Sequence, residues 1–335
     1  MKNAHAANQL GLFESETSSI GSRRALLQSI TWSYSRRSTF ERCALRYYFQ
    51  YFGANTRLAK AEPDKEELRL LKSVSSRHER TGSILHLAIA WCLRAAQRGE
   101  EPSTDRLVGW ARRLFVADRA YSRLDPDGLN PDHGSRFPPV LLREYHYRQP
   151  DAEQLCEEAE QRLLDALRTF ATDQSLNSLR LAGATPGALL EHPMRLHQSQ
   201  IPCRVGGRID LAYKCETSAT VADWKLGIGD GTADDSLQLA AYALWAVEHF
   251  ACDPSALRVC KVHLSSREVT DFPANAAVLR LTRARIVQDA ERMAAVQAYG
   301  EAGVAVAFSP CAQPAVCNSC PFQRICPEGK QFIDA

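Results

Sequence analysis

The sequence predicts an α/β fold in which a strand-rich segment lies between helical regions. Residues 77–98 and 153–170 repeat apolar side chains at the spacing of one helix face. From Ala188 the pattern changes to short apolar, β-branched runs separated by polar turns. Helical patterns return over 234–250 and 275–299. This order predicts a mixed central sheet flanked by helices.

The predicted strands fall into two single runs and two hairpins. The single runs are 189–196 and 201–205, and the second hairpin pairs 258–264 with 267–272. The first hairpin joins 208–213 to 219–225 through a polar turn at 216–218. In the N-terminal region, 33–53 has the pattern of one helix that ends at Gly53.

These patterns divide the 335 residues into five segments. The expected segments are a flexible tail (1–30), N-terminal helices (31–98), a helical insertion (99–185), a catalytic core (186–300) and a cysteine-rich tail (301–335). No apolar stretch reaches the roughly 18 residues of a membrane span, and the first residues lack a signal-peptide core. We therefore expect a cytoplasmic protein that is not embedded in a membrane.

The net charge of +2 does not by itself indicate nucleic acid, but the local charge does. Between Tyr34 and Lys60, six basic and seven aromatic residues accompany a single acid, Glu41. Basic side chains suit phosphates and aromatic ones suit bases. The same aromatic residues also fit the core face of a helix, and we expect both interpretations to hold.

The first hairpin carries side chains that ordinary strands avoid. Asp210 lies within its first apolar run, at the end of G-G-R-I-D, and Asp223 and Lys225 lie two apart on its second run. Residues two apart share a face, so Asp223 and Lys225 point the same way while Trp224 turns to the other side. If Asp210 lies on that face, two carboxylates and an ammonium form a divalent-metal site. The simpler alternative is a surface ion pair between Asp223 and Lys225.

The hairpin motifs resemble those of a known enzyme superfamily. G-R-I-D at 207–210, D-W-K at 223–225 and Q-L-A-A-Y at 238–242 are similar to the motifs of PD-(D/E)xK nucleases. The closest branch is the RecB-type nucleases, which include the AddB subunit and the CRISPR-associated exonucleases. The resemblance implies a restriction-endonuclease-like core.

The resemblance also implies roles for individual residues. Asp210 and Asp223 would hold Mg²⁺ or Mn²⁺, completed by His86 and the Trp224 carbonyl, and Lys225 would act on the attacking water. T-G-x-x-x-H at 81–86 matches the motif in which the family's histidine is a metal ligand. The alternative is that His86 is a half-buried side chain that only packs in the helix, as isolated histidines usually do. Gln238 and Tyr242 would contact DNA and support the lysine, and Glu191 corresponds to an acidic position near the site.

Eleven cysteines are many for a reducing compartment, where disulfides are rare. Cys317, Cys320 and Cys326 form C-x2-C-x5-C, one ligand short of a tetrahedral set. The resemblance supplies Cys43 as the fourth ligand of a [4Fe-4S] cluster that clasps the N-terminal helix to the C-terminal tail. Ala44 stands where the family has proline. Zinc is the alternative metal, and Cys311 is a competing ligand.

A short peptide in the tail suggests a partner. Gln9, Leu10, Leu12 and Phe13 resemble the peptide by which bacterial DNA-processing proteins bind the sliding clamp, although an ordinary apolar patch would look similar. No G-x4-G-K-[ST] motif occurs, so any helicase would be a separate protein.

Together these motifs predict a metal-dependent DNA nuclease in repair, recombination or mobile-element and defence processing. Its relatives suggest single-stranded DNA or DNA ends as the substrate. The alternative is a non-catalytic, nucleic-acid-binding subunit of a helicase or repair complex on the same fold. Such a subunit would be expected to carry a broken motif, whereas every motif residue is present here.

Overall fold

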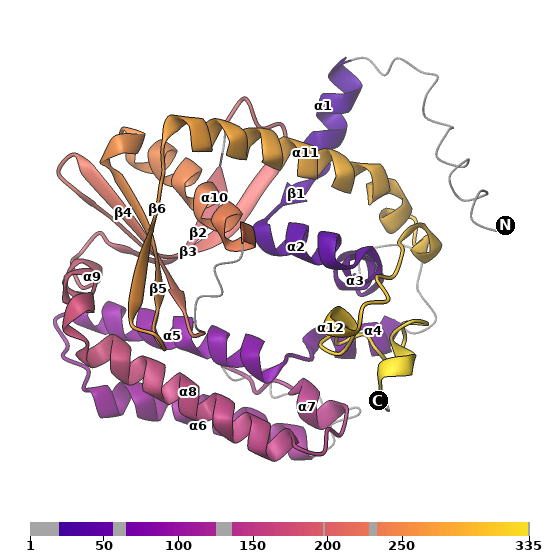
Figure 1. Cartoon of the computed structure of the whole chain (residues 1–335), viewed down its shortest axis with the longest axis horizontal. Helices are drawn as coiled ribbons and strands as arrows, with labels where there is room; N and C mark the ends of the chain where they lie inside the picture. Colours follow the sequence, from indigo (N-terminus) through magenta and orange to yellow (C-terminus); the bar gives the residue numbers. More distant parts are fainter. Residues whose placement is uncertain (1–19, 56–64, 125–135, 197, 228–232, 334–335) are drawn as a thin grey trace.

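A computed structural model describes residues 20–55, 65–124, 136–196, 198–227 and 233–333. Its centre is a mixed sheet with the order β1-β3-β4-β5-β6, and β2 pairs with β3 (Figure 1). β1 pairs with β3, and β4 with β5, in parallel, while the other pairs are antiparallel. The strands are β1 (Thr31–Trp32), β2 (Leu189–Leu196), β3 (Arg204–Cys215), β4 (Ser218–Lys225), β5 (Leu257–His263) and β6 (Glu268–Phe272).

Helices cover both faces of this sheet, as the sequence predicts (Figure 1). One face packs in a buried cluster with α10 (Ala233–Phe250) and α11 (Ala276–Glu301). The other packs with α5 (Arg77–Gln97), α6 (Thr104–Arg123), α8 (Ala152–Thr172) and α9 (Asn177–Gly183). The helical insertion is therefore part of the layer that carries α5. No helix among the described residues is long and apolar enough to cross a membrane.

The ladder between β2 and β3 changes face at one point. Leu190 and Leu211 pair and belong to the cluster with α5 and α8, whereas Met194 and Ile209 lie in the cluster with α10 and α11. Between these pairs stands Glu191, whose φ of 49° is unusual for a non-glycine residue in a strand. This irregular step lies beside Asp210 and turns side chains out of the regular alternation.

The edge of β3 opposite β2 is only partly occupied. β1 pairs there with Arg204 and Val205, and β4 pairs from Leu211 onwards. Among the described residues, no strand pairs with this edge between Gly206 and Asp210. β1 and β4 therefore occupy different stretches of the same edge of β3, and the gap between them leaves room for a site.

The predicted helix over 33–53 is wrong in its continuity. The structure breaks it into α2 (Tyr34–Arg42), α3 (Ala44–Tyr48) and a π-helical turn, η2 (Phe49–Gly53). Cys43 lies at the break with φ −161° and ψ 111°, and its sulfur accepts a hydrogen bond from the Arg46 N–H at 3.4 Å. The Leu45 N–H bonds to the Ser309 carbonyl at 3.2 Å, so tertiary contact to the C-terminal tail replaces a helical bond.

Two other expectations need correction. Residues 20–29, expected in the flexible tail, form α1 (Ile20–Ser29), because Leu27 and the following Ile30 find apolar partners in the core. The run 201–205 is not a separate strand, since Arg204 and Val205 already belong to the long β3. A further helix, α4 (Lys65–Ser73), precedes α5 in the chain.

Gly300 lets α11 approach η2 closely. A Cβ at this position would lie 2.7 Å from three ring atoms of Phe52, which is itself buried. We expect Gly300→Ala to lower the unfolding free energy by about 1–3 kcal/mol in urea denaturation because the rigid ring must shift. Gly109→Ala in α6 is the control, since its Cβ would meet only an arginine tip at 3.7 Å. Equal stability of the two variants would contradict this packing.

Candidate active site

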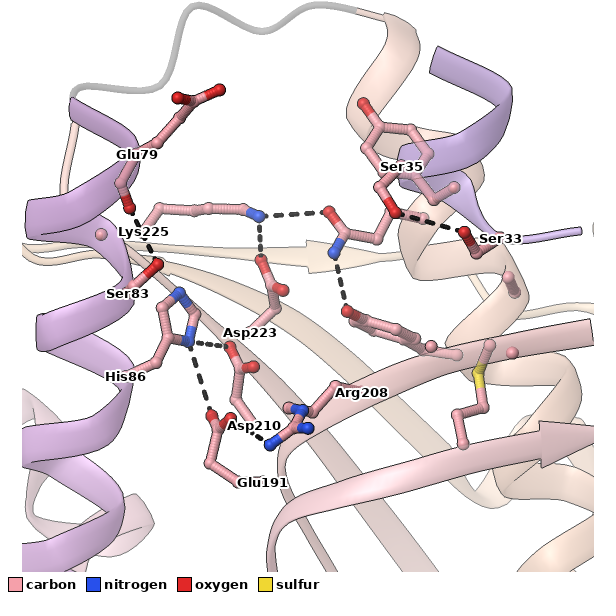
Figure 2. A pocket seen from close by; sticks show the side chains of 18 of the residues that line it. Ser33, Ser35, Glu79, Ser83, His86, Glu191, Arg208, Asp210, Asp223 and Lys225 are labelled. Carbon is pink, nitrogen blue, oxygen red and sulfur yellow. Dashed lines mark hydrogen bonds and ion pairs between the residues drawn. The ribbon is translucent and has the colours of Figure 1, made fainter. Parts of the chain in front are cut away.

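A cavity of about 800 Å³ opens where β1 and β4 part, and it reaches from α5 to α10. Figure 2 shows charged side chains from both sides turned toward one another in it. The chemically active residues in its lining are His78, Glu79, His86, Glu191, Arg208, Asp210, Asp223, Lys225, Gln238 and Tyr242. All the residues predicted for the hairpin site, except Trp224, therefore line one cavity.

One cluster joins α5 to the irregular step between β2 and β3. His86 Nδ1 lies 3.1 Å from Asp210 Oδ2 and 3.7 Å from Glu191 Oε1. Ligand atoms of these three residues all lie within 4.8 Å of one another (Figure 2). The Arg208 guanidinium lies 3.6 Å from the other Glu191 oxygen. One nitrogen and two carboxylates thus surround a point at which a cation could bind.

Asp210 is held in place from β4. The Trp224 N–H donates to Asp210 Oδ2 at 2.8 Å, so the backbone of the D-W-K segment fixes this carboxylate. The Trp224 indole packs on the opposite side against Phe170 of α8, as the alternation predicts. Asp223 is 1% exposed, and its Oδ2 lies 2.8 Å from Lys225 Nζ. This oxygen nevertheless accepts no hydrogen bond of normal geometry from the described residues.

Lys225 continues the site toward α10. Its Nζ donates to Gln238 Oε1 at 3.1 Å, and Gln238 Nε2 donates to the Tyr242 hydroxyl at 2.7 Å. Gln238 and Tyr242 are one helical turn apart and so lie on one face of α10. The helix therefore holds the ammonium between Asp223 and Gln238.

Residues 31–327 match the sequence model of the PD-(D/E)XK nuclease superfamily. The chain belongs to this superfamily. Its members are generally nucleases, and the mixed sheet flanked by helices agrees with their restriction-endonuclease-like core. No curated protein matches the chain in sequence.

Buried charge in this nuclease-superfamily site shifts several pKa values. Burial alone lowers the pKa of His86, but the charge and hydrogen bond of Asp210, with Asp223 and Glu191, raise it to about 9. Burial raises the pKa of Glu191, and the Asp210 charge raises it further. Burial also raises the pKa of Asp223 despite the adjacent Lys225. Crowded carboxylates of this kind are stabilised when a cation joins them.

The raised pKa of His86 predicts how stability depends on pH in the metal-free protein. Below the unfolded-state pKa of about 6.5, the protonated histidine contributes its full stabilisation. As the pH rises through about 9, the folded state loses this proton and the contribution disappears. We expect the stability difference between wild type and His86→Ala, measured by urea unfolding in EDTA, to shrink from pH 6 to above 9. A difference that stays constant or grows would contradict the ion cluster.

Glu191 is a site residue whose importance the sequence only suggests. The sequence predicts its strand, 189–196, correctly, but a short strand places an acidic residue on either face with equal ease. The positive φ that turns Glu191 toward His86 arises from pairing with β3 and has no local sequence signal such as glycine. Only its match to a family position indicates that it lies near the site.

Five cysteines line a second, smaller cavity where the N-terminal helices meet the C-terminal tail. They are Cys43, Cys311, Cys317, Cys320 and Cys326. The four predicted cluster ligands therefore converge, and Cys311 lies with them, its sulfur 3.9 Å from that of Cys317. Burial raises the pKa of the Cys320 thiol to about 11, so a metal must displace protons to bind these sulfurs.

Contacts beyond the cysteines tie this tail to the insertion. The buried Arg143 of α7 (Arg143–His146) donates to the Asn318 carbonyl and, at 3.0 Å, to the Gln323 side chain. Tyr147 donates to the Pro321 carbonyl at 2.8 Å. Neighbouring side chains thus help to position the loop that carries three thiols.

Two predicted binding segments have different outcomes. The clamp-like peptide of Gln9, Leu10, Leu12 and Phe13 lies outside the described residues and stays a prediction. In the basic N-terminal helices, Tyr47 and Tyr48 are 1% exposed and pack in the core, so for them the core interpretation is correct. Arg36 stacks over the ring of Tyr51 at 4.3 Å from its centroid.

Proposed function

We propose that this chain is a metal-dependent deoxyribonuclease that hydrolyses phosphodiester bonds in single strands or at DNA ends. The observation that carries the proposal is the convergence of His86, Glu191 and Asp210 on one point, beside buried Asp223 and its partner Lys225. An acidic cation site next to an ammonium, in an open cavity, is the arrangement that phosphodiester hydrolysis requires.

The side chains fit a divalent cation. Asp223 Oδ2 is a buried carboxylate oxygen whose partner among the described residues is the Lys225 ammonium, and its remaining lone pair can bind a metal cation. In this proposal His86, Asp210, Asp223 and the Trp224 carbonyl hold the ion, and Glu191 joins them. Carboxylates suit Mg²⁺, while the imidazole nitrogen favours Mn²⁺. The bound ion supplies Lewis-acid polarisation of the phosphate and makes the attacking water more acidic.

The protein's own groups orient the reaction. Lys225 Nζ is held between Asp223 and Gln238, so the side chain keeps one orientation, with its ammonium in the cavity. From this position the ammonium orients the attacking water and stabilises charge that develops on the phosphate. Gln238 keeps the lysine in place and Tyr242 keeps Gln238 in place. Because burial raises the pKa of Tyr242 well above its usual value, this hydroxyl stays protonated.

We further propose that the chain is a RecB-type member with a [4Fe-4S] clasp formed by Cys43, Cys317, Cys320 and Cys326. These thiols come from both ends of the described chain and line one cavity, which supports a structural bridge. The amide of Arg46 already points at Cys43, as amides do toward cluster sulfurs. We propose the same division into five segments, with α1 (Ile20–Ser29) joined to the N-terminal helices.

The assay that tests the function compares linear and circular single-stranded DNA. With Mn²⁺ or Mg²⁺ present, we expect end-labelled linear DNA to be degraded and EDTA to prevent it. If circular DNA resisted degradation, the enzyme would act from DNA ends. If circular DNA were cut, the enzyme would cleave internal phosphodiester bonds. Absence of degradation with either metal on both substrates, using folded protein, would contradict the proposal and favour a binding subunit.

A further inference from the structure

A second groove continues directly from the active-site cavity. It has a volume of about 960 Å³ and runs over β2 and the start of β3 toward α1. Met194, Gly206 and Gly207 line both the groove and the cavity, so the two spaces meet at this point. A molecule bound at the site therefore lies next to the groove.

The groove is positively charged. Arg24, Arg195 and Arg204 line it, all three are exposed, and its lining among the described residues includes no Asp or Glu. We call this lining the arginine groove. Arg204 donates to the Ser29 carbonyl at 2.8 Å, which fixes one cation at the rim. Three guanidinium groups without a carboxylate attract a polyanion.

Two glycines and one methionine form the border between groove and cavity. A Cβ on Gly207 would lie 3.0 Å from Met194 Cε, so this glycine makes room for the methionine side chain. A Cβ on Gly206 would find its nearest neighbour 3.9 Å away, so packing inside the fold does not require glycine there. Gly206 lies on the edge of β3 that has no strand partner among the described residues, and glycine at such a place lets another backbone approach closely. The backbone at Gly206 therefore offers a close approach to a strand that leaves the active site.

A pocket beside α8 offers a useful contrast. It is lined by Arg162, Arg168 and Arg267, but also by Asp165 and Asp173. Arg168 lies 2.6 Å from Asp165, and Arg267 lies 3.9 Å from Asp173. These acids offset the positive charge there. The arginine groove is thus the better route for a phosphate backbone.

We propose that the arginine groove binds the sugar–phosphate backbone of a single nucleic-acid strand whose scissile bond lies in the active-site cavity. The proposal rests on the proposed nuclease function and adds a binding track on one side of the cleaved bond. Exposed Pro193 and partly exposed Pro202 line the groove between the arginines and offer apolar contact to unstacked bases. A duplex keeps its bases stacked inside and could not use that surface.

The test measures binding and cleavage separately. Fluorescence anisotropy with a labelled single-stranded oligodeoxynucleotide in EDTA reports binding without turnover. We expect Arg24→Ala/Arg195→Ala to bind about tenfold more weakly at low salt. The slope of log affinity against log salt should fall by about 1.4, or about 0.7 for each phosphate that the variant no longer neutralises. Arg113→Ala, an exposed arginine of α6 outside both spaces, is the matched control.

Substrate length provides the second readout. If wild type cleaves DNA, the double variant should raise KM for long oligonucleotides and leave cleavage of a dinucleotide unchanged, because a dinucleotide does not reach the groove. The proposal that the arginine groove binds DNA would be wrong if the double variant kept the affinity and salt slope of wild type. It would also be wrong if Arg113→Ala weakened binding equally. Weaker binding by the double variant in a protein that cleaves nothing would support the groove and contradict the nuclease instead.

Discussion

We expect Lys225→Ala to lower the rate of the proposed metal-dependent DNA cleavage by about 100- to 1,000-fold and to leave the binding of single-stranded DNA intact. The size follows from the removal of one positioned charged donor at the reacting phosphate. The ammonium is held at 2.8 Å from Asp223 and 3.1 Å from Gln238, so no neighbouring side chain can replace it in the same place. The measurement is the single-turnover rate on an end-labelled oligonucleotide at saturating Mn²⁺.

Lys214→Ala is the matched control for that experiment. Lys214 is an exposed lysine of the same β3–β4 hairpin, and its Nζ bonds to the Phe250 carbonyl at 2.8 Å, away from the cavity. We expect its cleavage rate to equal that of wild type. A Lys225→Ala protein that cleaves at the wild-type rate, or a Lys214→Ala protein that loses activity equally, would remove Lys225 from the mechanism.

Asp223→Asn should also abolish cleavage, yet without a decrease in stability in EDTA. Burial raises the pKa of Asp223, so at neutral pH its charge is less favourable in the folded state than in the unfolded state. An isosteric neutral side chain removes that cost. We expect a urea midpoint at least equal to that of wild type, whereas added Mn²⁺ should stabilise only wild type. Equal stabilisation of both by Mn²⁺ would contradict metal binding by Asp223.

Cys43→Ser should remove the proposed cluster and loosen the junction of the two chain ends. Purified wild type should be brown with broad visible absorbance, and the variant should be nearly colourless with little iron. By analogy with disulfides, opening a link from Cys43 to Cys317 lowers the unfolding free energy by about 3–5 kcal/mol. Iron content, absorbance and urea unfolding measure these changes.

Two further cysteine variants make the ligand set testable. Cys215→Ser, at an exposed thiol of β3, should keep the full absorbance. Cys311→Ser should also keep it, because Cys311 lies in the cavity but outside the proposed ligand set. If Cys311→Ser lost the colour and Cys43→Ser kept it, Cys311 would be the fourth ligand in place of Cys43. If wild type were colourless and contained one zinc ion per chain, the iron–sulfur cluster would be wrong. The cysteines would then join the two ends of the described chain through zinc.

Local patterns predict most of the secondary structure because they depend on short-range physics. Strand 189–196 and the hairpin of β3 and β4 follow from period-two alternation and a polar turn. Asparagine is a favoured first residue for a helix, and Asn275 at the start of the predicted helix 275–299 accepts the Val278 N–H at 3.0 Å. No local pattern predicts the break at Cys43, because the Leu45 amide there bonds to Ser309, more than 260 residues away.

The sequence by itself predicted the members of the candidate site: Asp210, Asp223, Lys225 and His86 are the side chains that the resemblance to the nuclease superfamily implies. Only the tertiary structure decided how they meet. The gap between β1 and β4 depends on the pairing of β1 with β3, which lies far along the chain, and His86 reaches Asp210 from a helix more than 120 residues away. Such pairing is set by the burial of whole sheet faces, which no local pattern encodes.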